Sequence, residues 1–272
     1  MKRLFTIIAI TWAAVSCGNK LSLPEDPQVS QSGRYEFSAQ VASLADALVW
    51  TEGKAIGVYG SVKGANAKYV PYNEYHGKSG IVKLYGAAVE GDCVAYFPYC
   101  EEGNAPVAEG LCPYKAVQQY YPSASEHYSA NVVLVAKEVD GRFDLEHRAG
   151  LVRFEVDIDF EGEVKGVRLI SGLNSLSGNF PVDADGEIKD AGNTVTIRGM
   201  GKASGKFDVW FVLPAGSYET LQLMVMTDKT DMTKPVNGIV PVRAGEVTNM
   251  TVVDEAYEYT GSDFEKIPGI FD

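Results

Sequence analysis

The stretch that decides the fold is Leu151-Val152-Arg153-Phe154-Glu155-Val156-Asp157-Ile158-Asp159-Phe160. Its even-numbered residues are all apolar, and its odd-numbered residues are charged from Arg153 onward. Because successive side chains of a β-strand point to opposite faces, this alternation predicts a strand with one buried face and one face in water. Half-buried strands of this kind are typical of antiparallel sandwiches.

Other short apolar or β-branched runs lie on both sides of this strand, separated by Gly, Pro and Asn. They cover residues 35–41, 56–60, 81–85, 93–99 and 131–136 before it, and 164–170, 194–198, 206–213, 221–227, 238–242 and 247–253 after it. Only residues 44–50 have a short helical pattern. The spacing predicts an all-β chain of two tandem antiparallel β-sandwich domains, at residues 35–159 and 160–256, followed by a tail at 257–272.

The first seventeen residues have the pattern of a secretion signal. Two basic residues precede an apolar run at 4–15, which is shorter than the roughly 20 residues that a membrane-spanning helix needs. The run ends in Ala14-Val15-Ser16-Cys17, which resembles a lipobox. We therefore expect a signal peptide at 1–17, lipidation of Cys17 and a polar tether at 18–34; the alternative is an ordinary cleavable signal with a chance cysteine.

The charge of the chain limits the partners it can have. Removal of the signal takes away two of the 24 basic residues and leaves all 36 acidic ones, so the net charge becomes −14. A chain this acidic is a poor ligand for nucleic acid or for an anionic membrane surface. We expect neither partner.

Three further cysteines, Cys93, Cys100 and Cys112, would lie in a compartment that permits disulfides. Cys93 and Cys100 cannot be joined within one extended strand, because seven residues span about 23 Å. Cys100 and Cys112 flank a loop containing Gly and Pro, and we favour this pair as the disulfide, with Cys93 as a small buried side chain. A zinc site is the alternative, but no Cys-x-x-Cys spacing is present.

The sequence contains no arrangement typical of a catalytic or cofactor site. His76, His127 and His147 form no His-x-x-x-His pair, and no serine lies in a Gly-x-Ser-x-Gly elbow. Gly77-Lys78-Ser79 lacks the earlier glycine of a phosphate-binding loop. We expect a protein that is not an enzyme and that has no metal or cofactor.

Six tyrosines crowd one stretch of the first half. They are Tyr96, Tyr99, Tyr114, Tyr120, Tyr121 and Tyr128. If they are exposed, they predict a contact surface for a glycan or a protein. The alternative is that the large rings fill the sandwich and cover its loops.

Four segments follow one another along the chain: Trp50-Thr51-Glu52-Gly53-Lys54-Ala55-Ile56-Gly57-Val58-Tyr59, Ala95-Tyr96-Phe97-Pro98-Tyr99, residues 143–154 with His147, and Phe211-Val212-Leu213-Pro214-Ala215-Gly216-Ser217-Tyr218. In this order they resemble segments of the fimbrillin-like (FimA/Mfa-like) type V pilins and their surface-lipoprotein relatives. The resemblance implies two transthyretin-like sandwich domains and a lipid anchor in the outer membrane. In polymerising members, a trypsin-like protease cuts after an arginine beyond the first strand, and a strand of the next subunit fills the groove that remains.

The chain departs from this family pattern after the first strand, because no Arg or Lys occurs between Val41 and Lys54. Arg34 precedes the strand, so a cut there would release only the tether. The tail is also a poor donor strand, since Pro268-Gly269 interrupts it. We expect a structural or accessory, anchor-like subunit of adhesive fimbriae that pairs with other subunits by strand complementation. The alternative is a monomeric surface lipoprotein that binds a glycan or a host protein through the tyrosine-rich loops.

Overall fold

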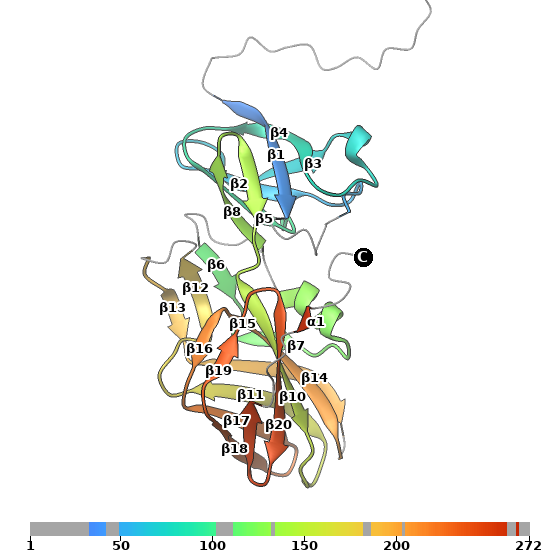
Figure 1. The fold of residues 1–272 in the computed structure, drawn as a ribbon, viewed down its shortest axis with the longest axis vertical. Helices are drawn as coiled ribbons and strands as arrows, with labels where there is room; N and C mark the ends of the chain where they lie inside the picture. The colour runs from blue at the N-terminus through green and yellow to red at the C-terminus, as the bar shows by residue number, and fades with distance from the viewer. Residues whose placement is uncertain are drawn as a thin grey trace, which may run out of the picture. The chain divides into compact units, whose positions relative to one another are not determined.

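The computed structural model describes residues 33–41, 49–101, 111–131, 134–181, 186–202, 205–259 and 265–266. Almost all of the regular structure in these ranges is β-strand, which confirms the all-β prediction (Figure 1). Residues 44–48, most of the expected short helix, lie outside the described residues, and Val49 and Trp50 are not helical. The finer description as two transthyretin-like sandwiches stays a prediction.

In the described residues, the first half of the chain contains nine strands, one 3₁₀ turn and one helix. They are β1 (Arg34–Val41), β2 (Ile56–Gly60), β3 (Ala67–Pro71), η2 (Asn73–Tyr75), β4 (Val82–Val89), β5 (Cys93–Phe97), β6 (Leu111–Tyr114), β7 (Val117–Gln119), α1 (Ala124–Asn131), β8 (Leu134–Val139) and β9 (Arg142–Leu145). The second series is β10 (Ala149–Val156), β11 (Val164–Ser171), β12 (Ser177–Pro181), β13 (Lys189–Gly192), β14 (Thr194–Lys202), β15 (Phe207–Pro214), β16 (Gly216–Tyr218), β17 (Leu221–Thr227), β18 (Asp231–Asn237), β19 (Val240–Val242), β20 (Glu246–Val253), β21 (Ala256–Tyr259) and β22 (Glu265–Lys266).

Seven strands of the first half form a closed barrel in the order β1-β4-β3-β2-β5-β8-β9. Strand β1 closes it, because β1 is antiparallel to β4 on one edge and parallel to β9 on the other. The barrel encloses a core of large side chains that includes Trp50, Tyr69 and Phe143. The first segment of the family resemblance therefore supplies core residues, since Trp50, Ile56 and Val58 are fully buried.

The strand predicted from the alternation at residues 151–160 is present as β10. Val152, Phe154 and Val156 are fully buried, whereas Arg153 and Glu155 are partly exposed. The strand ends at Val156, so Ile158 and Phe160 lie beyond it and only pack against the core from the side. The buried face and the wet face are thus those that the sequence predicts.

The partners of β10 all come from the second half of the chain. It is antiparallel to β15 and parallel to β20, in a ten-stranded sheet ordered β15-β10-β20-β21-β18-β17-β11-β14-β7, with β22 beside β20. We expected this strand to belong to the domain at residues 35–159. Two more segments from that range also pair with the second half, since β6 pairs with β12 and β7 with β14. The domain limits themselves stay a prediction.

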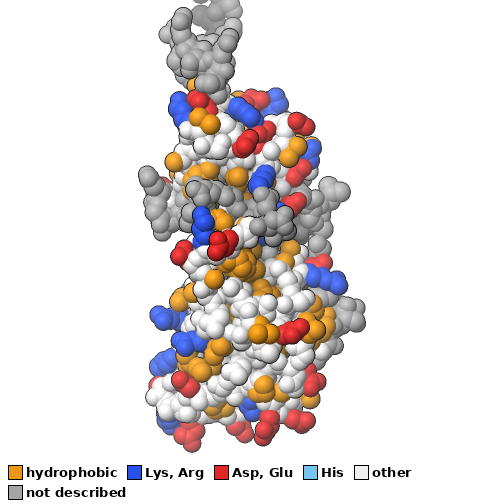
Figure 2. Space-filling model, turned by 90° about the vertical axis from the view of Figure 1, so that its left-hand side faces the viewer, with side chains coloured by type: hydrophobic (Ala, Val, Ile, Leu, Met, Phe, Trp, Pro, Cys, Tyr) orange, Lys and Arg blue, Asp and Glu red, His pale blue; other side chains and the backbone are white. Residues whose placement is uncertain are grey.

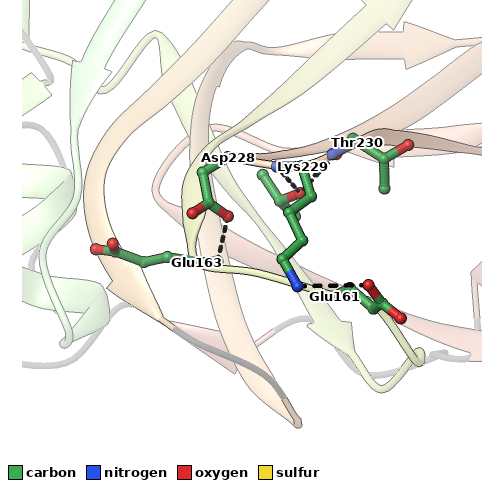
Figure 3. Close-up of polar contacts among 6 residues, drawn as sticks. Glu161, Glu163, Asp228, Lys229 and Thr230 are labelled. Carbon is green, nitrogen blue, oxygen red and sulfur yellow. Dashed lines mark hydrogen bonds and ion pairs between the residues drawn. The ribbon is translucent and has the colours of Figure 1, made fainter.

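A turn of the second half is held by side chains (Figure 3). Thr227 Oγ1 accepts hydrogen bonds from the backbone N–H groups of Lys229 and Thr230, which fixes the turn between β17 and β18. Asp228 Oδ1 accepts one from Glu163 N at 2.8 Å, and Lys229 forms an ion pair with Glu161 at 3.4 Å. These contacts join the turn to the segment that leads into β11.

Charged side chains of both signs are distributed over the surface, as the face in Figure 2 illustrates. On that face, acidic side chains gather at the lower end of the view. The described residues include no helix long and apolar enough to cross a membrane.

Candidate functional site

The site that the fold singles out is the position of β1 in the barrel. On the β4 side, Phe37, Ser38 and Ala39 lie opposite Leu84, Lys83 and Val82. On the β9 side, residues 38–41 pair with residues 142–145. Both backbone edges of the strand are thus hydrogen-bonded, and its removal would leave two unpaired strand edges.

Core packing holds β1 in addition to the backbone ladders. The Phe37 side chain is 1% exposed, and its ring centroid lies 4.9 Å from that of Phe143 and 5.3 Å from that of Tyr69. Ala39 is fully buried. Burial of a phenylalanine side chain stabilises a fold by about 1.5–3 kcal/mol. A strand that replaced β1 would have to fill the same two positions, two residues apart.

Polar contacts fix the start of β1. The Tyr69 hydroxyl lies within hydrogen-bond distance of two backbone carbonyl oxygens, 2.9 Å from that of Arg34 and 2.7 Å from that of Ala87. The Arg34 guanidinium forms an ion pair with Glu138 on β8. The side-chain hydrogen bond to Glu138 and the negative charge of Glu138 raise the pKa of Arg34. Arg34 is the first residue of β1, not a residue that precedes the strand as the sequence suggested, and its side chain is engaged with the barrel.

The six clustered tyrosines do not form one exposed surface. Tyr96, Tyr114 and Tyr128 are buried, with exposed fractions of 2%, 7% and 0%. Tyr99, Tyr120 and Tyr121 are only partly exposed. In this structure the three buried rings are therefore not available as a contact surface, and only the other three retain that prediction.

The hydroxyls of two of the buried tyrosines bind backbone carbonyls where the first half of the chain leads into β10. Tyr114 donates to Arg148 O at 2.7 Å, and Tyr128 donates to Ala149 O at 2.8 Å. The Tyr128 hydroxyl also lies 3.0 Å from His147 Nδ1. The histidine of the family-like junction is thus held by the hydroxyl of a buried tyrosine.

The side chain of Gln118 makes a pair of hydrogen bonds that the sequence did not predict. Gln118 on β7 donates through Nε2 to Val212 O at 2.8 Å and accepts through Oε1 from Val212 N at 3.1 Å. His127 Nε2 lies 3.0 Å from the same Oε1 and must be its donor, because an amide oxygen only accepts. Burial lowers the pKa of His127 to about 4. These three residues form the Gln118 clasp, which joins β7 and β15, the two ends of the sheet order.

Cys93, Cys100 and Cys112 are thiols in the structure. Burial raises the pKa of Cys112 to about 11, so its thiolate is disfavoured. Residues 102–110 between Cys100 and Cys112 are outside the described ranges, and the Cys100–Cys112 disulfide stays a prediction. Cys17, the expected lipidation site, also lies outside the described residues. Among the residues that are described, no group of three His, Cys, Asp or Glu side chains is arranged to hold a metal ion.

Comparisons with known proteins give only distant similarities. No protein-family model and no curated protein matches the sequence. A proposed cell adhesion protein from Bacteroides ovatus is 15% identical over 87% of this chain and 98% of its own, with a TM-score of 0.46. A second, from Bacteroides uniformis, is 14% identical over 88% and 99%, also with a TM-score of 0.46.

The tip fimbrial protein Mfa3 from Porphyromonas gingivalis, in a C-terminally truncated form, is similar at 11% identity. The alignment covers 83% of this chain and 97% of that one, with a TM-score of 0.35. Similarity at this level establishes neither a shared fold nor a shared function.

Proposed function

We propose that this chain is a fimbrillin-like cell-surface lipoprotein, a structural or accessory, anchor-like subunit of adhesive fimbriae, and not an enzyme. The observation that carries the proposal is the place of β1, which is paired on both edges and closes the barrel over Phe37 and Ala39. A strand in this position is the element that a neighbouring subunit would replace during strand complementation.

The sequence beside β1 supports an anchor-like role over a polymerising one. No Arg or Lys lies between Val41 and Lys54, so a protease that cuts after arginine has no target there. In this proposal the chain keeps β1, remains attached to the outer membrane through lipid on Cys17, and meets other fimbrial subunits at the base of the fibre.

The C-terminal segment also fits this role. Strand β21 is antiparallel to β20 and parallel to β18, and its Tyr257 is fully buried in the core. The first residues of the expected tail, 257–259, are therefore already paired within the ten-stranded sheet of the same chain. A segment paired on both sides is a poor donor strand for another subunit.

The alternative role, a monomeric lipoprotein that binds a glycan or host protein through the tyrosine-rich loops, has less support. Three of its six rings are buried and bind other parts of the chain. Two domains of the transthyretin-like type remain part of the fimbrillin-like proposal.

The test is proteolysis of the purified chain with an arginine-specific protease of the trypsin type, followed by electrophoresis without boiling. We expect the chain to keep residues 42–53 uncut and to run as a monomer. The matched control is Ser43→Arg, which supplies the missing arginine and should be cut after β1. Cleavage of the parent chain within 42–53 together with a ladder of polymers would contradict the proposal.

A second measurement is the N-terminal residue of the mature protein on cells. A lipid-modified Cys17 is the expected result. A mature protein that starts beyond residue 41 would instead identify a polymerising subunit that has lost β1.

A further inference from the structure

The outer face of the barrel carries a small aromatic patch on β1, β3 and β4. The strand register places Glu36 opposite Tyr85 and Tyr85 opposite Val70, so these three form one row across the strands. Lys83 and Tyr72 lie in the next row, where Tyr72 N donates to Lys83 O at 3.2 Å. We call these five residues the tyrosine patch.

The alternation of the strands explains why these side chains point outward. Their chain neighbours Phe37, Leu84 and Tyr69 are 1% exposed or less and lie in the barrel core. Side chains on the opposite face of the same strands must therefore point away from the core. Tyr85 is 44% exposed as a result.

The patch is held in one arrangement by its own contacts. The rings of Tyr72 and Tyr85 have centroids 4.6 Å apart and planes tilted by 38°. The Tyr72 hydroxyl donates to Glu36 Oε2 at 2.8 Å, and Lys83 Nζ donates to Glu36 Oε1 at 3.2 Å. The hydrogen bond from Tyr72, followed by that from Lys83, lowers the pKa of the Glu36 carboxyl.

The hydrogen-bonding capacity of the patch fits a ligand that both donates and accepts. A carboxylate has about four acceptor positions and an ammonium group three donors, so these two hydrogen bonds leave both Glu36 and Lys83 with capacity to spare. Their charges cancel, so the patch attracts neither an anion nor a cation strongly. The apolar rings between them suit a flat face of C–H groups.

We propose that the tyrosine patch binds a neutral saccharide, with a sugar ring stacked on Tyr85 and hydroxyl groups bonded to Glu36 and Lys83. A saccharide presents both C–H faces and hydroxyls, which match the rings and the two charged groups. The site shares no residue with the tyrosine-rich loops, and it goes beyond the fimbrial role because a monomer would suffice for binding.

The size and composition of the patch disfavour a protein partner. Neighbouring strands lie about 4.8 Å apart, so a row across three strands spans about 10 Å. A stable protein interface buries about 800 Å² on each partner, and its centre is depleted of Lys and Glu. A ligand the size of a few sugar rings matches this area better.

The experiment uses the purified full-length chain in detergent on an array of neutral and acidic oligosaccharides. The neutral oligosaccharide that binds best is then titrated by calorimetry. We expect Tyr85→Ala to weaken its binding by about tenfold or more, because the stacked ring is lost. Tyr85→Phe keeps the ring and should retain most of the affinity, whereas Lys83→Ala should weaken binding through lost hydrogen bonds.

The matched control is Tyr35→Ala, which removes a tyrosine that is 48% exposed on β1 but is not part of the patch. It should leave saccharide binding unchanged. The melting temperature of each variant shows whether it is folded. If Tyr85→Ala is unfolded, Lys83→Ala takes its place in the binding test. The proposal would be overturned if no neutral saccharide bound, or if this face preferred acidic glycans or a protein. It would also be overturned if Tyr85→Ala and Lys83→Ala both bound the saccharide as tightly as the parent. None of these results depends on fimbrial assembly.

Discussion

The side-chain amide of Gln118 pairs with both backbone groups of Val212, as a neighbouring β-strand would. Its Nε2 donates to Val212 O at 2.8 Å, and its Oε1 accepts from Val212 N at 3.1 Å. Gln118 is 1% exposed, so these bonds are shielded from water. Among the described strands, β15 is the first of the sheet order and β7 the last, so the Gln118 side chain satisfies part of the open edge of β15.

We predict that Gln118→Ala destabilises the protein by about 2–4 kcal/mol, because a buried N–H and a buried C=O lose their partners. Chemical denaturation followed by circular dichroism measures this change. Gln119→Ala is the matched control. The side chain of Gln119 is exposed, so its removal should change the free energy of unfolding by about 0.5 kcal/mol or less. Equal stability of the two variants would contradict the role of the clasp.

The second prediction concerns pH. Burial lowers the pKa of His127 from 6.5 to about 4 in the folded chain, so the unfolded chain binds the proton more readily between these values. The stability contribution of neutral His127 is therefore present above pH 6.5 and is lost as the pH falls toward 4. The loss amounts to about 3 kcal/mol.

The measurement is the free energy of unfolding of the parent chain and of His127→Leu across that range. The parent should lose stability more steeply than the variant as the pH falls, because the variant lacks the titrating group. Parallel curves for the two proteins would show that His127 does not cause the dependence.

The third prediction is that Phe154→Asp prevents folding. Phe154 is fully buried, and its ring makes edge contacts with Phe211 at 5.7 Å and Tyr257 at 5.3 Å. An unpaired buried carboxylate costs several kcal/mol, which is comparable to the stability of a domain. Phe154→Leu, which keeps the site apolar, should cost only about 1 kcal/mol.

Thermal melting followed by circular dichroism distinguishes these variants. The predicted domain at 35–159 includes Phe154, but the structure places Phe154 in the core built around the ten-stranded sheet, so the loss of folding is expected there. An unchanged melting temperature for Phe154→Asp would mean that this side chain does not face the core.

The strands and their buried faces could be predicted because the alternation is a local property of the chain. The pairs that hold β1 and β10 in place could not be predicted in the same way. The parallel pairs β1–β9 and β10–β20 join segments roughly a hundred residues apart, and many strands have patterns that would fit. Tertiary packing selects the partner, and the local alternation along the chain does not show which strand that is.

Helix α1 was missed although the sequence carries its start signal. Ser123 Oγ accepts a hydrogen bond from Glu126 N at 3.3 Å, which is the N-cap bond expected of a Ser-x-x-Glu start, and the Ser123 hydroxyl donates to Glu126 Oε2 at 2.9 Å. The weak apolar pattern of Ala124–Asn131 hid the helix. Its His127 belongs to the Gln118 clasp, so missing the helix also meant missing that contact.

The tyrosine patch could not be predicted either. Tyr72 and Tyr85 lie thirteen positions apart and join only through the pairing of β3 with β4, while Glu36 arrives from β1. The clustered tyrosines at 96–128 suggest a contact surface because they are close in sequence. Three of them are buried, so closeness in sequence predicts an exposed aromatic surface less well than the pairing of strands does.

The fourth prediction is the Cys100–Cys112 disulfide in protein exported to an oxidising compartment. Non-reducing peptide mapping should recover peptides of these two cysteines as one cross-linked species, with Cys93 as a thiol. Cys93 is 3% exposed, so it should react with an alkylating reagent only after unfolding. A bridge closing a loop of this size would stabilise the fold by about 3 kcal/mol. Free thiols at both Cys100 and Cys112 would refute the pairing.

The last prediction is membrane attachment through Cys17, in the lipobox-like segment Ala14-Val15-Ser16-Cys17. Acyl chains on one residue anchor a protein because each buried CH₂ group contributes about 0.8 kcal/mol, and several chains together give stable attachment. In detergent phase separation, the parent should enter the detergent phase, and Cys17→Ser should remain unprocessed or enter the aqueous phase. Cys93→Ser is the control, since its side chain is buried in the barrel core and should not affect attachment. If Cys17→Ser without its signal peptide still partitions into detergent like the parent, another part of the chain must hold the protein at the membrane.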